Sequence, residues 1–433
     1  MSIQNIYSLF LECNNKISTD SRKIEIGSLF FALKGENFDG NQFAHQALEK
    51  GAKYCIIDDP NLPKQEQFIL VENALVALQE LANFHRKKFS IPILAITGSN
   101  GKTTTKELIS TVLSKKYNLL STQGNLNNHI GVPLTLLRLN NSHEFAVIEM
   151  GANHQGEIWD LCEITEPEYG VITNIGKAHL EGFGGLEGVK RGKSELYKYI
   201  QLKKGKVFIH GDDETLQELA SNLDKITYGT KKLYDVVGKI NHNANMVEFA
   251  WKTRYNATEI KNAVFVKSNL VGLYNYFNIL CAACVGNFFK VSEIEINTAI
   301  SEYSPDNNRS QLKKTKKNLL ICDYYNANPS SLKAAIDNFK KSDFDKKFLI
   351  LGDMLELGEE SQSEHQSIIN TLNELFLDEF ILVGPIFKRI LPEKSFLDTE
   401  ECLTYIKENN LKEKTILIKG SRGIALEKLI TAL

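Results

Sequence analysis

Short apolar runs alternate with amphipathic stretches along most of the chain. Runs such as 91–96 and 145–148 are typical of strands that are buried on both faces of a parallel sheet. The stretches between them place apolar residues at helical spacing, as at Leu108, Ile109 and Val112. Because strands and helices alternate, the pattern predicts an α/β fold with helices on both faces of parallel sheets.

The pattern divides the chain into three expected domains, because 433 residues exceed what a single core usually holds. The pattern predicts a small α/β domain at residues 1–88 and a central parallel-sheet domain at residues 89–301. It predicts a Rossmann-like α/β domain at residues 302–433. Expected strands are 28–33, 53–57, 91–96, 145–151, 170–175, 318–323, 347–351, 380–383 and 415–418; expected helices are 43–50, 73–88, 106–113 and 332–339; expected turns or loops are 17–22 and 122–133, and 227–262 carries irregular strand signals.

The overall charge excludes several classes of partner. A formal net charge of −2 gives no general attraction for nucleic acid or for an anionic membrane. The first residues lack the basic flank and apolar core of a signal peptide. We therefore expect a cytoplasmic protein that neither binds nucleic acid nor inserts into a membrane, and we expect it to be a monomer.

Cysteine usage supports the same compartment. The seven cysteines are scattered and odd in number, which is typical of reduced thiols in the cytoplasm. Cys281 and Cys284 have the spacing of a metal or redox pair, but no second pair lies nearby, so we expect packed core thiols. They fall in the apolar window 270–289, whose asparagines favour a buried helix over a membrane span.

A glycine-containing turn between the strand at 91–96 and the helix at 106–113 is the clearest candidate for chemistry. Gly98 and Gly101 allow the backbone to approach an anion closely, and a helix N-terminus favours negative charge. Lys102 can reach terminal phosphate oxygens. The turn therefore predicts a nucleotide site, and an ordinary polar turn is the alternative.

Other candidates depend more on context. Glu149 ends an apolar strand beside the turn, which suits a Mg²⁺ ligand, a helix cap or a surface acid. His179 follows another strand, although a lone histidine is usually structural. The charge run 190–195 is by default a solvated helix face, and 20–22 (Asp-Ser-Arg) is by default a solvated turn that could instead grip a diphosphate.

Longer motifs narrow the interpretation. They are Glu-Met-Gly-Ala at 149–152, Tyr-Asn-Ala-Asn-Pro at 325–329, Leu-Gly-Asp-Met-Leu-Glu-Leu-Gly at 351–358 and Lys-Gly-Ser-Arg at 419–422. With the short phosphate loop at 97–104, this ordered set resembles the Mur ligases, the ATP-dependent amide-forming ligases of peptidoglycan synthesis, over all three sections. It looks most like the branch that adds D-alanyl-D-alanine to UDP-N-acetylmuramoyl-tripeptide.

The resemblance implies a role for each matched position, with ATP and Mg²⁺ as cofactors. Lys102, Lys193 and His179 would be catalytic, and Lys193 would be carbamylated. Nucleotide contacts would come from Gly98, Ser99, Asn100, Gly101, Lys102, Thr103, Thr104, Asn275, Asn278, Arg309 and Asp323. Metal ligands would be Thr103, Glu149, His179 and Lys193. Substrate contacts would come from Ser18, Asp20, Ser21, Arg22, Asp39, Gly40, Asn127, Asn128, Tyr325, Asn326 and Asn328. Relatives usually carry a histidine where this chain has Tyr274.

The chemistry implied is carboxylate activation by ATP through an acyl phosphate, which the amine of D-alanyl-D-alanine then attacks. One alternative is another amide ligase of this fold, such as a folylpolyglutamate synthase, which the N-terminal domain and the motif at 325–329 argue against. A second alternative, a P-loop regulatory switch, would need neither a second metal site nor a separate substrate domain. Lysine and diaminopimelate both remain open as the third residue of the acceptor tripeptide.

Overall fold

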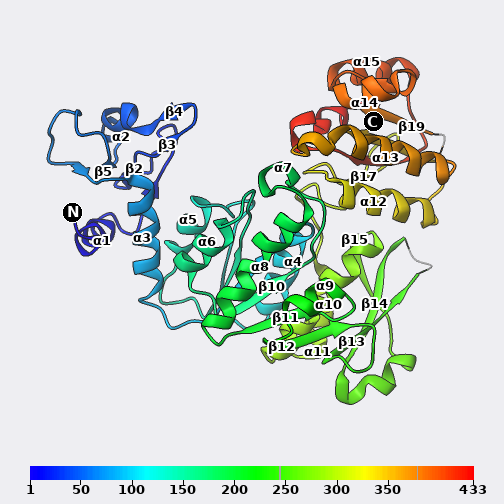
Figure 1. Cartoon of the computed structure of the whole chain (residues 1–433), viewed down its shortest axis with the longest axis horizontal. Helices are drawn as coiled ribbons and strands as arrows, with labels where there is room; N and C mark the ends of the chain where they lie inside the picture. Colours follow the sequence, from blue (N-terminus) through cyan, green and yellow to red (C-terminus); the bar gives the residue numbers. More distant parts are fainter. Residues whose placement is uncertain (243–244, 378) are drawn as a thin grey trace. The chain divides into compact units, whose positions relative to one another are not determined.

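The computed structural model describes residues 1–242, 245–377 and 379–433, and its elements are labelled in Figure 1. The chain forms two compact units. Unit 1 contains residues 1–95, 117–151 and 156–169, and unit 2 contains residues 96–116, 152–155 and 170–433.

The N-terminal part of unit 1 is built on a parallel sheet with the strand order β1-β2-β5-β6. Phe30, Ala44 and Cys55 belong to its core. The helix α3 begins after Asn73, whose side chain accepts a hydrogen bond from the amide of Val76. The elements are α1 (Ile3–Glu12), β1 (Ile17–Ser18), β2 (Leu29–Phe31), β3 (Lys34–Gly35), β4 (Phe38–Asp39), η1 (Gly40–Phe43), α2 (Ala44–Glu49), β5 (Tyr54–Ile57), β6 (Phe68–Leu70) and α3 (Ala74–Arg86).

The central sheet has nine strands in the order β15-β14-β13-β12-β11-β10-β7-β9-β8. Its pairs β8–β9, β11–β12 and β12–β13 are parallel, whereas β13–β14 and β14–β15 are antiparallel. The elements are β7 (Ile93–Thr97), α4 (Lys102–Leu113), β8 (Leu119–Ser121), α5 (Gly131–Leu136), β9 (Phe145–Glu149), α6 (Glu157–Thr165), β10 (Tyr169–Ile172), α7 (Leu180–Phe183), α8 (Leu186–Leu202), β11 (Lys206–His210), α9 (Glu214–Leu219), β12 (Asp224–Gly229), β13 (Val236–Asn241), β14 (Met246–Thr253), η2 (Arg254–Asn262), β15 (Val266–Val271), η3 (Leu273–Asn275), α10 (Tyr276–Phe288) and α11 (Glu293–Glu302).

The C-terminal part holds a six-stranded sheet in the order β16-β17-β21-β18-β19-β20, in which β16 alone is antiparallel to its neighbour. Leu320, Ile350 and Ile418 are buried in its core. Figure 1 shows α12 and α13 side by side in this part. The elements are β16 (Gln311–Lys314), β17 (Leu319–Cys322), α12 (Pro329–Lys341), β18 (Lys347–Gly352), η4 (Gly358–Glu360), α13 (Ser361–Glu374), β19 (Phe380–Val383), α14 (Pro385–Ile390), η5 (Pro392–Lys394), β20 (Ser395–Phe396), α15 (Thr399–Asn409), β21 (Thr415–Lys419), η6 (Arg422–Ile424) and η7 (Leu426–Leu429).

The expected α/β architecture is confirmed, and four local predictions need correction. The window 270–289 is not one helix, because β15 ends at Val271 and Gly272, with φ of 97°, turns the chain before α10. The expected turn 17–22 begins with strand β1, and the loop 122–133 ends inside α5. The central sheet is mixed because β13–β14 and β14–β15 are antiparallel pairs, formed by the predicted irregular region 227–262 and the strand that follows it. Residues 243 and 244 of that region lie outside the described residues, and the domain boundaries at 88 and 301 stay predictions.

All seven cysteines are free and buried, as expected for packed thiols. Cys281 and Cys284 lie in α10, and burial raises the pKa of the Cys281 thiol to about 12. A thiol with so high a pKa is a poor nucleophile and a poor metal ligand. Within the part of the chain that the structure describes, no helix is long and apolar enough to cross a membrane.

Arg86 anchors the end of α3 inside unit 1. Its buried guanidinium donates hydrogen bonds to the carbonyl oxygens of Thr165, Phe89 and Glu166, at 2.9, 2.8 and 3.2 Å, and to Glu168 at 2.8 Å. These bonds satisfy the carbonyl groups where α6 ends.

We expect Arg86→Met to destabilise unit 1 by about 2 kcal/mol, because buried carbonyl groups lose a charged donor. Lys87→Met is the matched control. The Lys87–Glu166 ion pair is largely exposed, so its loss should cost less than about 0.5 kcal/mol. Thermal unfolding of both variants makes the comparison, and equal midpoints would contradict the anchoring role.

Candidate active site

The turn between β7 and α4 has the backbone of a phosphate-binding loop. Gly98 and Gly101 have φ values of 138° and 78°. A Cβ at Gly98 would lie 2.0 Å from the hydroxyl of Thr173, and one at Gly101 would lie 2.8 Å from the side-chain oxygen of Asn278. Both positions therefore need glycine for conformation and for space.

A second loop, which follows β10, fixes the shape of the first. Thr173 donates to the carbonyl oxygen of Asn100 at 2.6 Å, and Asn174 donates to the same oxygen at 2.9 Å. The Asn174 side chain also accepts the amide of Asn100, and Ser99 exchanges hydrogen bonds with the backbone of Gly176. Sequence reasoning predicted Ser99 and Asn100 but missed Thr173, Asn174 and Gly176. The available signal was their position directly after the neighbouring strand.

Lys102 opens α4 with its ammonium group folded back over the loop. Its Nζ donates to the carbonyl oxygens of Gly98 and Ser99, at 2.8 and 3.3 Å. Thr103 and Thr104 follow in the first turn of the helix and are buried. A positive group, a helix N-terminus and a glycine loop thus meet at one place, which suits the phosphates of a nucleotide.

Asn275 at the end of η3 and Asn278 in α10 brace the loop. Asn278 accepts a hydrogen bond from the Thr105 hydroxyl at 3.1 Å and donates to Asn275 at 3.0 Å. Asn275 in turn donates to the carbonyl oxygen of Val271. The preceding residue, Tyr274, shares a 2.8 Å hydrogen bond with Ser310. The observed contacts of both asparagines are structural, and their contact with a nucleotide stays a prediction.

Glu149 is buried at the end of β9 in unit 1. Asn127 donates to its carboxylate at 2.8 Å, and the Glu149 amide donates to the hydroxyl of Thr122. Asn128 accepts the amide of Gly131, the first residue of α5. Asn127 and Glu149 thus share one hydrogen-bonded corner, and Asn128 follows Asn127 directly in the chain.

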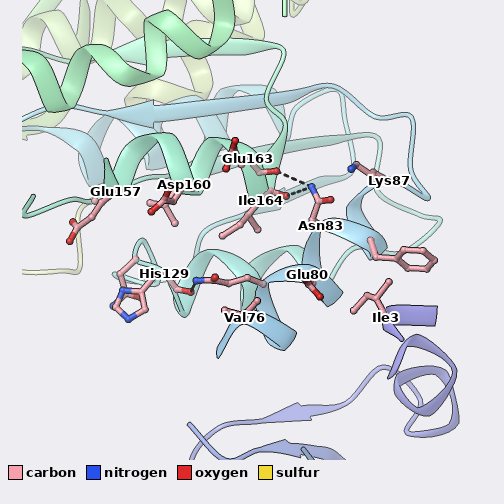
Figure 2. A pocket seen from close by; sticks show the side chains of 15 residues that line it. Ile3, Val76, Glu80, Asn83, Lys87, His129, Glu157, Asp160, Glu163 and Ile164 are labelled. Atoms are coloured by element: carbon pink, nitrogen blue, oxygen red, sulfur yellow. Dashed lines mark hydrogen bonds between the residues drawn. The ribbon is translucent and has the colours of Figure 1, made fainter. Parts of the chain in front are cut away.

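A hollow of about 570 Å³ extends from this corner between α3 and α6. Figure 2 shows Glu157, Asp160 and Glu163 along α6, with His129 at one end of the hollow. Asn128 and Gly151 also line it, so the hollow is continuous with the corner that holds Glu149. Sequence reasoning did not find it, because its lining comes from separate segments of the chain.

The charge run 190–195 is not a solvated face at Lys193, and that default interpretation is wrong. Lys193 is 1% exposed in α8. Its Nζ donates to the carbonyl oxygen of Ala152 at 3.0 Å and lies 4.9 Å from the centre of the Phe183 ring. Gly192 allows this packing, because a Cβ there would lie 2.4 Å from that ring.

His179 lies on a loop that contacts the turn after β18. Its imidazole pairs with the carboxylate of Glu356, and this hydrogen bond lowers the pKa of Glu356. Nearby, Lys177 pairs with Glu364, and its amide donates to Ser330 at 3.0 Å. Glu356, Lys177 and Glu364 were not predicted as site residues, although Glu356 lies in a quoted motif.

The C-terminal part gathers the remaining predicted residues at the ends of β17 and β21. Asp323 pairs with Lys419 at 2.7 Å and accepts the amide of Ser310. The guanidinium of Arg309 stacks 3.6 Å from the ring centre of Tyr325.

Two further predicted residues lie close to this group. Asn326 lines a cavity of about 200 Å³ together with Tyr325, Glu356 and Arg422. Asn328 caps α12 and donates to the side chain of Asn100 at 2.7 Å. The phosphate loop and the start of α12 are therefore in direct contact.

The predicted substrate residues of the N-terminal part lie on two turns. The guanidinium of Arg22 donates two hydrogen bonds of 2.9 Å to the carboxylate of Asp20. These bonds lower the pKa of Asp20 to about 2. Ser18 donates to backbone carbonyls of the same turn, and Ser21 accepts from Lys50 through its carbonyl oxygen. The Arg22 side chain is 85% exposed, as in a solvated turn.

The second turn is held by buried Asn41. Its side chain donates to Asp39 at 2.7 Å and to Asp58 at 2.8 Å. Gly40 packs so closely that a Cβ would lie 2.5 Å from the carbonyl oxygen of Leu33. Asp39 and Gly40 are thus fixed in place, and their contact with a substrate stays a prediction.

Three family models match consecutive parts of the chain. They are the Mur ligase family catalytic domain at residues 15–86, the Mur ligase middle domain at 96–286 and the Mur ligase glutamate ligase domain at 308–422. The chain belongs to the Mur ligase family. The three matches follow the same order as the three expected sections.

Relatives of this Mur ligase are similar along its whole length. The UDP-N-acetylmuramoyl-tripeptide–D-alanyl-D-alanine ligases of Haemophilus influenzae and Bacillus subtilis are 36% and 35% identical to it, covering 96% of this chain and 93% and 92% of theirs. The crystal structure of MurF from Acinetobacter baumannii matches with a TM-score of 0.86 at 33% identity, over 96% of this chain and 92% of that one. MurF from Thermotoga maritima in complex with ADP matches with a TM-score of 0.84 at 27% identity, over 97% of each chain.

Proposed function

We infer that this Mur ligase is an ATP-dependent ligase that joins D-alanyl-D-alanine to UDP-N-acetylmuramoyl-tripeptide. The products are the UDP-linked pentapeptide, ADP and phosphate, as in peptidoglycan synthesis. The observation that carries this conclusion is full-length similarity to ligases of that one name, at up to 36% identity. The glycine loop with Lys102 supplies the matching chemistry.

The residues present fit ATP and Mg²⁺. The loop at 98–101 places two glycines of positive φ beside Lys102 at the start of α4, which suits phosphate groups. Mg²⁺ prefers the hydroxyl and carboxylate oxygens that Thr103 and Glu149 offer. Among residues 1–242, 245–377 and 379–433, no three His, Cys, Asp or Glu side chains gather into a metal site. A lysine amine does not suit Mg²⁺, whereas a carbamate on Lys193 would add oxygen ligands. We propose Thr103, Glu149, His179 and carbamylated Lys193 as ligands, and bound Mg²⁺ would screen the phosphate charges.

In the first step, the carboxylate of the tripeptide attacks the γ-phosphorus of ATP, and the bond to the bridging oxygen of ADP breaks. Lys102 offsets the negative charge that accumulates on the transferring phosphoryl group. In the second step, the amine of D-alanyl-D-alanine attacks the acyl phosphate. The amide bond forms, the C–O bond to phosphate breaks, and the amine loses a proton.

The remaining predicted residues are assigned to the UDP, peptide, D-alanyl-D-alanine or ATP sites according to the part of the chain in which they lie. We propose that Ser18, Asp20, Ser21, Arg22, Asp39 and Gly40 bind the UDP portion, where the Arg22 fork could exchange Asp20 for a diphosphate. Asn127 and Asn128 bind the peptide portion, and Tyr325, Asn326 and Asn328 bind D-alanyl-D-alanine. Ser99, Asn100, Gly101, Thr104, Asn275, Asn278, Arg309 and Asp323 complete the ATP site. The protein acts as a cytoplasmic monomer, with domains at 1–88, 89–301 and 302–433.

Phosphate release tests this function directly. We expect release from ATP only when UDP-N-acetylmuramoyl-tripeptide and D-alanyl-D-alanine are both present, with a pentapeptide product of matching mass. Offering lysine and diaminopimelate tripeptides in parallel identifies the third residue. Release that ignores D-alanyl-D-alanine, or turnover of a folate substrate with glutamate instead, would overturn the proposal.

A further inference from the structure

A buried histidine lies beneath the turn that follows β18. His365 of α13 has no exposed surface, and its Nδ1 donates to the carbonyl oxygen of Ser361 at 2.6 Å. With the proton on Nδ1, the other ring nitrogen is an acceptor. That nitrogen, Nε2, accepts the backbone amide of Met354 at 3.0 Å. The contacts on both sides of the ring thus define a neutral imidazole.

The same turn is tied down at two further points. The Asp353 carboxylate accepts the amides of Ile386 and Phe387, at 2.8 and 2.9 Å, at the start of α14. The amide of Leu355 donates to the hydroxyl of Ser421 at 2.9 Å. Between these points, the Met354 amide is held by the imidazole of His365.

This turn forms one wall of the 200 Å³ cavity described above. Leu355 and Glu356 line that cavity together with Tyr325 and Arg422. Glu356 has a φ of 63°, a conformation that residues other than glycine adopt at a cost. The turn therefore holds Glu356 in a conformation that its neighbours must stabilise.

We propose that His365 is a positioning residue for D-alanyl-D-alanine binding, holding the 354–357 turn in shape as a neutral imidazole and releasing it when protonated. The proposal rests on the proposed function, because the cavity is assigned to that substrate. His365 is not among the residues that line the cavity, and it acts through the amide of Met354.

The surroundings of His365 show what protonation would change. Asp353 approaches from the end of β18, with 3.5 Å between its Oδ1 and Nε2, and Glu364 is the neighbouring charge on α13. The ring of Phe387 packs edge-on from α14 at 4.6 Å. A proton on Nε2 would end acceptance from Met354 and turn that nitrogen toward Asp353. Burial lowers the pKa of His365, so the neutral form persists at neutral pH.

The first test follows the amide of Met354 directly. The chain has only four methionines, so labelling with [¹⁵N]methionine gives a sparse spectrum, and Met354→Leu identifies the signal. We expect the Met354 amide signal to move as the pH falls below the pKa of His365. In His365→Gln the signal should stay in place, because a glutamine amide oxygen can accept the same hydrogen bond without titrating. This readout needs no substrate, so it stands even if the proposed function fails.

The second test compares KM for D-alanyl-D-alanine across pH. In the wild-type enzyme, KM should rise by about tenfold per pH unit below the pKa of His365, with kcat changing less. His365→Gln should keep the KM of neutral pH and lose this rise. His242→Gln, at an exposed histidine, is the control and should keep the wild-type profile. The proposal would be overturned by a Met354 amide signal that does not change with pH. It would also be overturned if the dependence of KM on pH in His365→Gln equalled that of the wild-type enzyme.

Discussion

Lys102→Ala should lower kcat by about 10³-fold, because the enzyme loses the ammonium group that we propose stabilises charge on the transferring phosphoryl group. In the structure this group is held by the carbonyl oxygens of Gly98 and Ser99, within the cradle itself. Phosphate release at saturating concentrations of all three substrates measures the effect. The loop should stay folded, since Thr173, Asn174 and Ser99 hold it through bonds that do not involve Lys102.

Lys115→Ala provides the matched control for this loss. Lys115 lies just after the C-terminal end of α4, the helix that Lys102 begins. It pairs with Glu302 at 3.0 Å, outside the cradle. Its removal takes away the same charge and should leave kcat near the wild-type value. Wild-type turnover in Lys102→Ala would contradict the proposal that the cradle binds ATP. An equal loss of kcat in both variants would indicate a general effect of charge.

Carbon dioxide should control activity through Lys193. The neutral amine adds CO₂ to form a carbamate and releases one proton, which converts a cation into an oxygen ligand for Mg²⁺. We expect Lys193→Ala to lose activity by about 100-fold or more, as happens when a metal site loses the groups that build it. We also expect the wild-type enzyme to lose activity in CO₂-depleted buffer and to recover it when bicarbonate is added.

The surface lysine Lys198 is the control for this experiment. It lies on the same helix, α8, but is exposed, so Lys198→Ala should keep both full activity and the response to bicarbonate. Intact-protein mass spectrometry under CO₂ detects the adduct independently. Full wild-type activity without CO₂ would show that Lys193 acts as a plain amine, held by the carbonyl oxygen of Ala152.

Features set by neighbouring residues could be predicted from the sequence. The strands β9, β18, β19 and β21 were expected nearly at their observed positions. A short apolar run favours a buried strand through its own residues, whatever surrounds it in the fold. The glycine turn at 98–101 was expected as well, since the need for Gly98 and Gly101 is a property of the local backbone. The prediction of a single helix over 270–289 was wrong, because apolar composition alone does not distinguish a strand from a helix.

The tertiary structure decided how the chemical groups are held. A charge run gave no sign that Lys193 would be buried against Phe183, because burial depends on the elements that pack around it. Asn278 braces Thr105, and Asn328 meets Asn100, across long separations in the chain. The sequence by itself determined most of the elements, the glycine turn and the family motifs, since these are local patterns. Only the fold determined the supporting contacts, because each one joins residues that chain order keeps far apart.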